Sequence, residues 1–173
     1  IKSDHEIAIK KEYLDLFKKL KNKGAFLIGY TGAHGIANSL ISIIKAVEKL
    51  RNENVYLILI GSGLEKENLI NYCVANHIEN VHFFPQIPKE CIPIYLKQFD
   101  ILYIGLQPCN LFKYGISPNK IFDYMMAGKP IIQAIDAGNN LVKEANCGID
   151  VEPENIDQLI AAILKLKSLT PEQ

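Results

Sequence analysis

The stretch Phe26-Leu-Ile-Gly-Tyr30, which runs into Thr31-Gly-Ala-His-Gly35, predicts a buried strand followed by a glycine-rich turn. A helix should come next, because apolar residues return after the turn at helical spacing. Its predicted buried stripe consists of Leu40, Ile41, Ile44, Val47 and Leu50. Val55-Tyr-Leu-Ile-Leu-Ile60 then predicts a second buried strand, which ends at Gly61-Ser-Gly63. A strand, a helix and another strand in this order are typical of a parallel sheet.

The same alternation continues along the rest of the chain. Further strands are predicted at residues 81–84, 101–106, 130–135 and 148–151, the last of them at an edge. Helices are predicted at residues 65–77, 89–98, 118–127, 139–145 and 156–166. Because the strands do not alternate with polar residues, helices should cover both faces of the sheet. We therefore expect an α/β fold with an open, doubly wound parallel sheet (Rossmann-like) of about five or six strands.

The length of 173 residues suits one domain with a substantial core. We assign residues 25–173 to this α/β domain and residues 1–24 to a connector from a preceding domain. The reason is that the chain opens Ile1-Lys-Ser-Asp4, without an initiator methionine or an apolar signal region. Residues 13–23 predict a basic helix with one apolar face. This helix either packs on the domain or lies on a membrane surface, and we favour packing.

Composition narrows the functional classes. The formal net charge of zero argues against a nucleic-acid-binding surface. Arg51 is the single arginine among 19 basic residues, so a bound phosphate must be held by backbone N–H groups, by lysine or by this residue. The four cysteines form no C-x-x-C pair, which argues against a disulfide framework or a zinc site. These features predict a cytoplasmic domain with reduced thiols.

The turns that follow the strands are the candidate site, because open parallel sheets bind ligands beyond the carboxyl ends of their strands. Gly32 and Gly35 in the first turn would let a diphosphate approach backbone N–H groups at a helix N-terminus. No Gly-Lys-Ser/Thr follows, so this turn is not a P-loop. The second strand lacks an acidic residue at its end, which argues against NAD. His34 either donates to a phosphate or has no functional role, and both readings stay open.

The segment Ser117-Pro-Asn-Lys-Ile-Phe-Asp-Tyr124 is the most informative part of the sequence. Ser117 is a predicted N-cap and Pro118 the first helical residue. Lys120 and Asp123 should share the exposed face of this helix. The opposite, buried face is predicted to consist of Ile121, Phe122, Met125 and Met126.

Two readings of the exposed face follow. Lys120 in the first helical turn is favourable where an anion binds, because the helix dipole disfavours a lone cation there. Asp123 would then accept hydrogen bonds from ribose hydroxyls. The alternative is an exposed ion pair worth less than about 1 kcal/mol. We favour the binding role because the helix starts at the carboxyl edge of the sheet.

The turn Phe84-Pro-Gln-Ile-Pro88 after the third strand is stiffened by its two prolines. Backbone groups of Pro85, Gln86 and Ile87 could read the edge of a base. The alternative is an ordinary proline-rich loop, and composition does not separate the two.

Taken together, these segments resemble the C-terminal domain of the retaining, GT-B-fold glycosyltransferases often called group 1. The resemblance covers residues 25–166. It rests on four segments in a fixed order: Gly29-Tyr-Thr-Gly-Ala-His-Gly35, Ile60-Gly-Ser-Gly63, Val81-His-Phe-Phe-Pro-Gln-Ile-Pro88 and Asp123-Tyr-Met-Met-Ala-Gly-Lys-Pro130. One half of a GT-B fold is the architecture that the resemblance implies.

The resemblance also implies roles for the candidate residues. The turn from Gly32 to Gly35 would face the donor diphosphate, Pro85 to Ile87 the base, and Asp123 the ribose. The family usually has a second acidic residue where this chain has Gly115, and an arginine and a lysine where it offers only His34. These departures resemble a branch of bacterial surface-polysaccharide transferases, including amino-sugar transferases, with Ser-Pro-x-Lys before the acidic residue. Ser117 would then belong to the site, and Lys120 would be the catalytic cation that stabilises charge on the departing β-phosphate.

The expected ligand is a nucleoside-diphosphate sugar, with UDP favoured, bound without metal or cofactor. Acceptor and remaining catalytic groups are expected on an N-terminal domain, with a lipid-linked sugar at the membrane as one candidate acceptor. The fragment alone should be inactive in transfer. Rival readings are half of a GT-B sugar-nucleotide epimerase and a non-catalytic nucleotide-binding Rossmann module. A receiver-like signalling domain would need a carboxylate cluster at the strand ends that is missing from the sequence.

Overall fold

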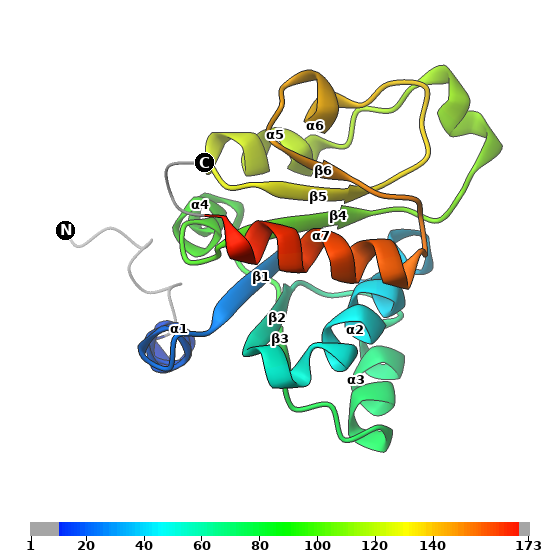
Figure 1. The fold of residues 1–173 in the computed structure, drawn as a ribbon. Coiled ribbons are helices and arrows are strands. Elements are labelled where there is room, and N and C mark those ends of the chain that lie inside the picture. Colours follow the sequence, from blue (N-terminus) through cyan, green and yellow to red (C-terminus); the bar gives the residue numbers. More distant parts are fainter. Residues whose placement is uncertain (1–10, 170–173) are drawn as a thin grey trace.

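The computed structural model describes residues 11–169, which form a six-stranded sheet flanked by helices (Figure 1). The strands are β1 (Phe26–Thr31), β2 (Val55–Ile60), β3 (Val81–Phe84), β4 (Ile101–Gly105), β5 (Ile131–Ala134) and β6 (Gly148–Asp150). Their order is β3-β2-β1-β4-β5-β6, and every neighbouring pair is parallel. The predicted open, doubly wound Rossmann-like α/β sheet is therefore confirmed.

Two separate apolar cores lie on the two faces of the sheet. On one face the sheet packs against α2 (Leu40–Lys49), α3 (Lys66–Ala75) and α7 (Ile156–Ser168). On the other face lie α1 (Lys11–Asn22), α4 (Ile92–Leu96), α5 (Asn119–Met126) and α6 (Leu141–Glu144). Short 3-10 helices complete the chain: η1 (Ile36–Asn38), η2 (Arg51–Glu53), η3 (Lys89–Cys91) and η4 (Asn110–Tyr114). Successive side chains along a strand point to opposite faces of the sheet, so they pack in opposite cores. Leu27, for example, belongs to one core and Ile28 to the other.

Helix α1 packs on the domain, as predicted. Phe17 is 1% exposed, and the ring of Tyr13 stacks on that of Phe84 with a centroid distance of 4.1 Å. The apolar face of α1 is thus buried in the same core as α4, α5 and α6. Within the described residues, no helix is long and apolar enough to span a membrane.

The start of α5 and its buried face differ from the prediction. The helix begins at Asn119, and the residue in the N-cap position is Pro118, in extended conformation with no side-chain cap. Ser117 is exposed and is not the N-cap. The buried residues are Ile121 and Tyr124, one turn apart, so the face is rotated from the predicted one. Phe122 and Met126 are 49% and 88% exposed, and this part of the prediction is wrong.

A smaller difference concerns α2. Ile43 is fully buried there, whereas the predicted Ile41 is only partly buried. The helix packs against both the sheet and its neighbour α7, so its apolar face is broad. A single stripe of residues predicted from helical spacing therefore misses one side of that face.

Candidate functional site

The turns after β1 and β2 interlock at the carboxyl edge of the sheet. Gly32 N donates to Ile60 O at 3.0 Å and His34 N donates to Ser62 O at 2.8 Å. A Cβ at Gly61 would lie 1.9 Å from Gly32 O, a distance that no side chain tolerates. Glycine is therefore required there by close backbone approach.

A cavity of about 300 Å³ opens beside these turns. Its walls come from the end of β1 and the turn after it (residues 31–33), the end of β2 and the turn after it (residues 60–62) and, in the turn after β3, from Gln86 and Ile87. Lys89 and Ile92 close it on the side of α4. The structure thus brings the predicted Gly32, Gln86 and Ile87 to one cavity at the edge where ligands of such sheets bind.

Lys120 lies directly against the turn after β1. Its Nζ donates to Tyr30 Oη at 2.8 Å and contacts Asn38 Oδ1 at 3.5 Å, and a Cβ on Gly32 would be 2.8 Å from this nitrogen. Burial lowers the pKa of Lys120 to about 8, so the ammonium form still prevails at neutral pH. The side chain is half-buried, and the expectation that it is exposed is wrong. The arrangement places a cation beside glycine backbone, which suits an anion.

Tyr30 is the residue that positions this cation. Its hydroxyl donates to Ala33 O at 2.7 Å, which leaves the oxygen to accept from Lys120. The ring is fully buried, and burial raises its pKa, so it remains a neutral hydroxyl. Tyr124 ties α5 to the same turn, because its Oη accepts from Thr31 N at 2.9 Å.

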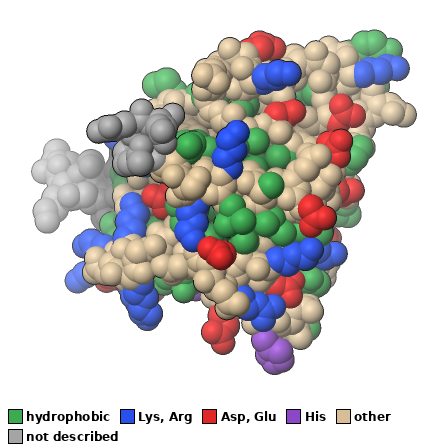
Figure 2. Space-filling model, in the orientation of Figure 1, with side chains coloured by type: hydrophobic (Ala, Val, Ile, Leu, Met, Phe, Trp, Pro, Cys, Tyr) green, Lys and Arg blue, Asp and Glu red, His purple; other side chains and the backbone are tan. Residues whose placement is uncertain are grey.

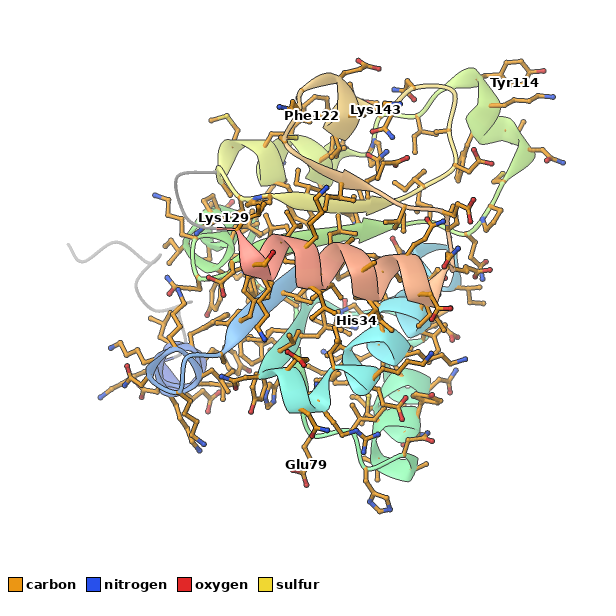
Figure 3. All side chains as sticks on the ribbon, viewed as in Figure 1. His34, Glu79, Tyr114, Phe122, Lys129 and Lys143 are labelled. Atoms are coloured by element: carbon orange, nitrogen blue, oxygen red, sulfur yellow. The ribbon has the colours of Figure 1, made fainter. Side chains whose placement is uncertain are left out.

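His34, for which the sequence left a phosphate donor and no functional role both open, is buried inside the domain. It is 0% exposed, and neither ring nitrogen has a hydrogen-bond partner within the described residues. Its ring lies within the molecule near the rings of Tyr30 and Phe83 (Figure 3). Burial, and then the charges of Lys66 and Lys120, lower the pKa of His34 to about 4, so the imidazole is neutral. A role in phosphate binding stays a prediction and would require the ring to leave this position.

The remaining predicted residues do not line the cavity. Pro85 is exposed beside Gln86, and Gly35 precedes η1. Ser117 is exposed in the loop before α5. Asp123 is half-buried on α5, one turn beyond Lys120, and among residues 11–169 its carboxylate has no hydrogen-bond or ion-pair partner. The alternative reading, a surface ion pair between Lys120 and Asp123, is thus not realised in the part of the chain described.

Lys66 was not among the residues predicted from the sequence, yet it connects the turns after β2 and β3. Its Nζ donates to Gly61 O at 2.8 Å and to Phe84 O at 2.6 Å, which ties the ends of β2 and β3. The only sequence signal is a lysine at the start of the helix after Gly61-Ser-Gly63, and such lysines are usually solvated.

Charged side chains of both signs share the visible face of the protein, and no carboxylate cluster occurs among the described residues. Acidic and basic side chains are mixed over the face seen in Figure 2, in keeping with a net charge of zero. Within residues 11–169, no group of three or more His, Cys, Asp or Glu side chains could hold a metal ion.

The fold and its glycine-rich turns are those of a doubly wound, Rossmann-like α/β domain, and the sequence identifies its family. Residues 25–168 match the family described as glycosyl transferases group 1, and the chain belongs to this family. The predicted family is thereby confirmed. No curated protein matches the sequence.

Solved structures share this fold at low sequence identity. Anabaena HepE in complex with UDP and glucose has a TM-score of 0.70 and 19% identity, over 92% of this chain and 43% of that chain. WaaG, a glycosyltransferase involved in lipopolysaccharide biosynthesis, has a TM-score of 0.70 and 20% identity, over 99% and 44%. The C-terminal domain of the group 1 family protein LpcC from Francisella tularensis has a TM-score of 0.61 and 17% identity, over 88% and 82%. This chain spans less than half the length of HepE and WaaG, but most of the LpcC domain.

Proposed function

We propose that this chain is the donor-binding, C-terminal domain of a retaining GT-B glycosyltransferase, which moves a sugar from a nucleoside-diphosphate sugar to an acceptor. UDP is the favoured nucleotide. The family match supports the reaction class. The complex of HepE with UDP supports the nucleotide, and the similarity to a C-terminal LpcC domain supports the position in the chain.

The observation that carries the proposal is the position of Lys120. Its ammonium lies against Gly32, and Gly32 lines the cavity. The N–H groups of Gly32 and His34 already donate to protein carbonyls, so a diphosphate in this turn would meet the N–H groups of Ala33 and Gly35 and one cation, without needing an arginine. Because negative charge grows on the β-phosphate as the sugar leaves, a fixed ammonium stabilises the transition state more than the ground state. We expect this binding to need no metal ion.

The acceptor and the other catalytic groups would lie on an N-terminal domain across a cleft. The chain alone should therefore bind nucleotide and not transfer sugar. We place the full-length enzyme in the cytoplasm, associated with the membrane if the acceptor is a lipid-linked sugar. Bacterial surface-polysaccharide or glycolipid synthesis is the pathway we favour, which the similarity to WaaG supports.

The rival readings are less favoured. A sugar-nucleotide epimerase half or a non-catalytic Rossmann module would share the fold but not the family match. NAD would also lack an acidic ribose ligand at the end of β2, where Ile60 precedes Gly61.

Isothermal titration calorimetry of this chain with UDP, GDP, dTDP and NAD, all in EDTA, tests the proposal. We expect UDP to bind most tightly and NAD not to bind. Affinity for none of the three diphosphates, or binding that appears only after Mg²⁺ or Mn²⁺ is added, would contradict it.

A further inference from the structure

The second half of α1 and the turn after it carry a concentrated positive charge. Residues 18–23 hold four lysines and no acidic residue, although the chain as a whole has no net charge. The acidic residues of the helix, Glu12 and Asp15, lie in its first half. All four lysines are exposed: Lys18, Lys19, Lys21 and Lys23. We call these four residues the α1 lysine cluster.

Lysines at the ends of other helices are paired, whereas those of the α1 lysine cluster are not. In the last turn of α2, Lys49 lies 3.7 Å from Asp157, and in the last turn of α7, Lys167 lies 3.2 Å from Glu53. Among residues 11–169, no carboxylate or other acceptor contacts an ammonium group of the cluster. The helix dipole favours lysine in a last turn, but it does not account for four unpaired like charges side by side.

The domain holds the backbone of this cluster in a fixed position. The ring of Phe17 packs edge-on against that of Phe99 at a centroid distance of 5.2 Å, and Leu20 is buried. In the turn, Asn54 Nδ2 donates to Lys23 O at 2.9 Å. Helix α1 therefore cannot roll its charged face inward. Figure 2 shows basic side chains gathered on the side of the molecule where Figure 1 places α1.

An anionic lipid bilayer fits the cluster better than a nucleic acid does. Lipid phosphates form a mobile array without fixed directions, which suits the flexible point charge of lysine more than the rigid fork of arginine. Residues 18–24 contain no arginine and no aromatic residue, the side chains on which nucleic-acid bases stack. Because the apolar face of α1 is already buried in the domain, contact with a bilayer would be electrostatic and would not involve insertion.

We propose that the α1 lysine cluster docks this domain on an anionic lipid surface through charge alone. The inference goes beyond the proposed function, because the cluster shares no residue with the donor cavity. It also reconciles the two readings of the basic helix. One face of α1 packs on the domain, and the other presents ammonium groups to lipid phosphates.

Flotation of this chain with lipid vesicles tests the proposal. We expect binding to phosphatidylcholine vesicles that contain about a third phosphatidylglycerol, and no binding to phosphatidylcholine alone. The bound chain should be released at about 0.5 M NaCl, where the Debye length falls to about 4 Å. A chain that ignores phosphatidylglycerol, or that stays bound at high salt, overturns docking by charge alone.

Two matched triple variants locate the docking surface. The first should bind the anionic vesicles about 100-fold more weakly, at about fivefold for each lysine that is lost; it combines Lys18→Gln, Lys19→Gln and Lys21→Gln. The control removes the same charge from α2 and α7, on the other face of the sheet, and should lose less than about fivefold because salt screens distant charges. It combines Lys45→Gln, Lys49→Gln and Lys165→Gln. Equal losses in the two variants overturn the assignment to α1.

Two further measurements complete the test. Glutamine keeps a high helix propensity, and thermal melting confirms that each variant is folded. Both variants should bind UDP like the parent, so the docking surface and the donor site stand or fall separately. A DNA duplex that removes the chain from the vesicles at equal phosphate concentration would assign the cluster to nucleic acid and overturn the proposal.

Discussion

Lys120 and Lys113 each hold an ammonium over a tyrosine ring, but in opposite surroundings. Lys120 Nζ lies 4.2 Å from the centroid of the Tyr30 ring, and Lys113 Nζ lies 5.0 Å from that of Tyr114. Tyr30 is fully buried in the core at the end of β1. Tyr114 is 80% exposed and projects from the outer edge of the domain (Figure 3).

The difference shows what burial adds to a cation–ring contact. The Tyr30 ring is packed and its hydroxyl is fixed on Ala33 O, so the ammonium of Lys120 has a defined position. Water and salt screen the exposed pair, and such pairs contribute about 0.5–1 kcal/mol. The same two residue types therefore give a positioned, partly desolvated charge in one place and a solvent-exposed surface contact in the other.

Removing each cation in turn should give the largest contrast. We expect Lys120→Met to weaken UDP binding by about 1–3 kcal/mol, roughly 5- to 150-fold, because a charge-assisted contact to the diphosphate is lost. Lys113→Met, the matched control, should change UDP affinity by less than about twofold. Uridine, which has no phosphates, should bind both variants like the parent. Calorimetry measures UDP and uridine binding to the parent and to both variants. Equal UDP affinities in the two variants would mean that Lys120 contributes to packing and not to diphosphate binding.

The sequence predicted this contrast only in part. The order of strands and helices followed from local apolar runs and glycine turns, and the structure agrees. Lys120 stood out because of its place in the first turn of a helix. Its partner Tyr30 did not, because the two residues are 90 positions apart and a tyrosine inside an apolar strand looks like ordinary core.

The burial of His34 is a second feature that the sequence did not predict. A histidine in a glycine-rich turn suggests a donor in solvent, yet the ring is buried without a hydrogen-bond partner among the described residues. The direction of a side chain at a turn depends on φ/ψ and on the neighbouring turn, here residues 61–65, to which the backbone of His34 is bonded. Neither factor can be read from spacing. The hydrogen bonds of Lys66 to Gly61 O and Phe84 O could not be predicted for the same reason.

The pH dependence of UDP binding should show the role of Lys120 as well, with a smaller change in affinity than Lys120→Met gives. Because burial lowers the pKa of Lys120 to about 8, the ammonium is present below that pH and is lost as the pH rises through it. UDP affinity should fall by up to about tenfold between pH 7 and pH 9.5, while a bound diphosphate shifts the midpoint upward. Lys120→Met should show no such fall beyond that of uridine, which controls for titration of the base. If UDP affinity falls with pH in Lys120→Met as it does in the parent, the pH dependence belongs to another titratable group.

Asp123→Asn should give the smallest effect and a different pattern. Asparagine keeps the size and one acceptor oxygen but removes the charge, so a ribose hydrogen bond should weaken by about 1 kcal/mol, roughly fivefold. Because the ribose is common to both ligands, uridine and UDP should lose affinity alike, whereas Lys120→Met affects UDP alone. Asp136→Asn is the matched control, since Asp136 is an exposed carboxylate in the turn after β5.

The sign of the change separates the two readings of Asp123. A carboxylate that only sits one turn from Lys120 repels a diphosphate, so its neutralisation would strengthen UDP binding and leave uridine unchanged. A carboxylate that binds ribose gives the reverse, a loss for both ligands. Its half-buried side chain has no protein partner within residues 11–169, so Asp123→Asn should leave the melting temperature near the parent's value. Tighter UDP binding by the folded variant would therefore remove Asp123 from the ribose contact and leave Lys120 as the one charged group assigned to the donor.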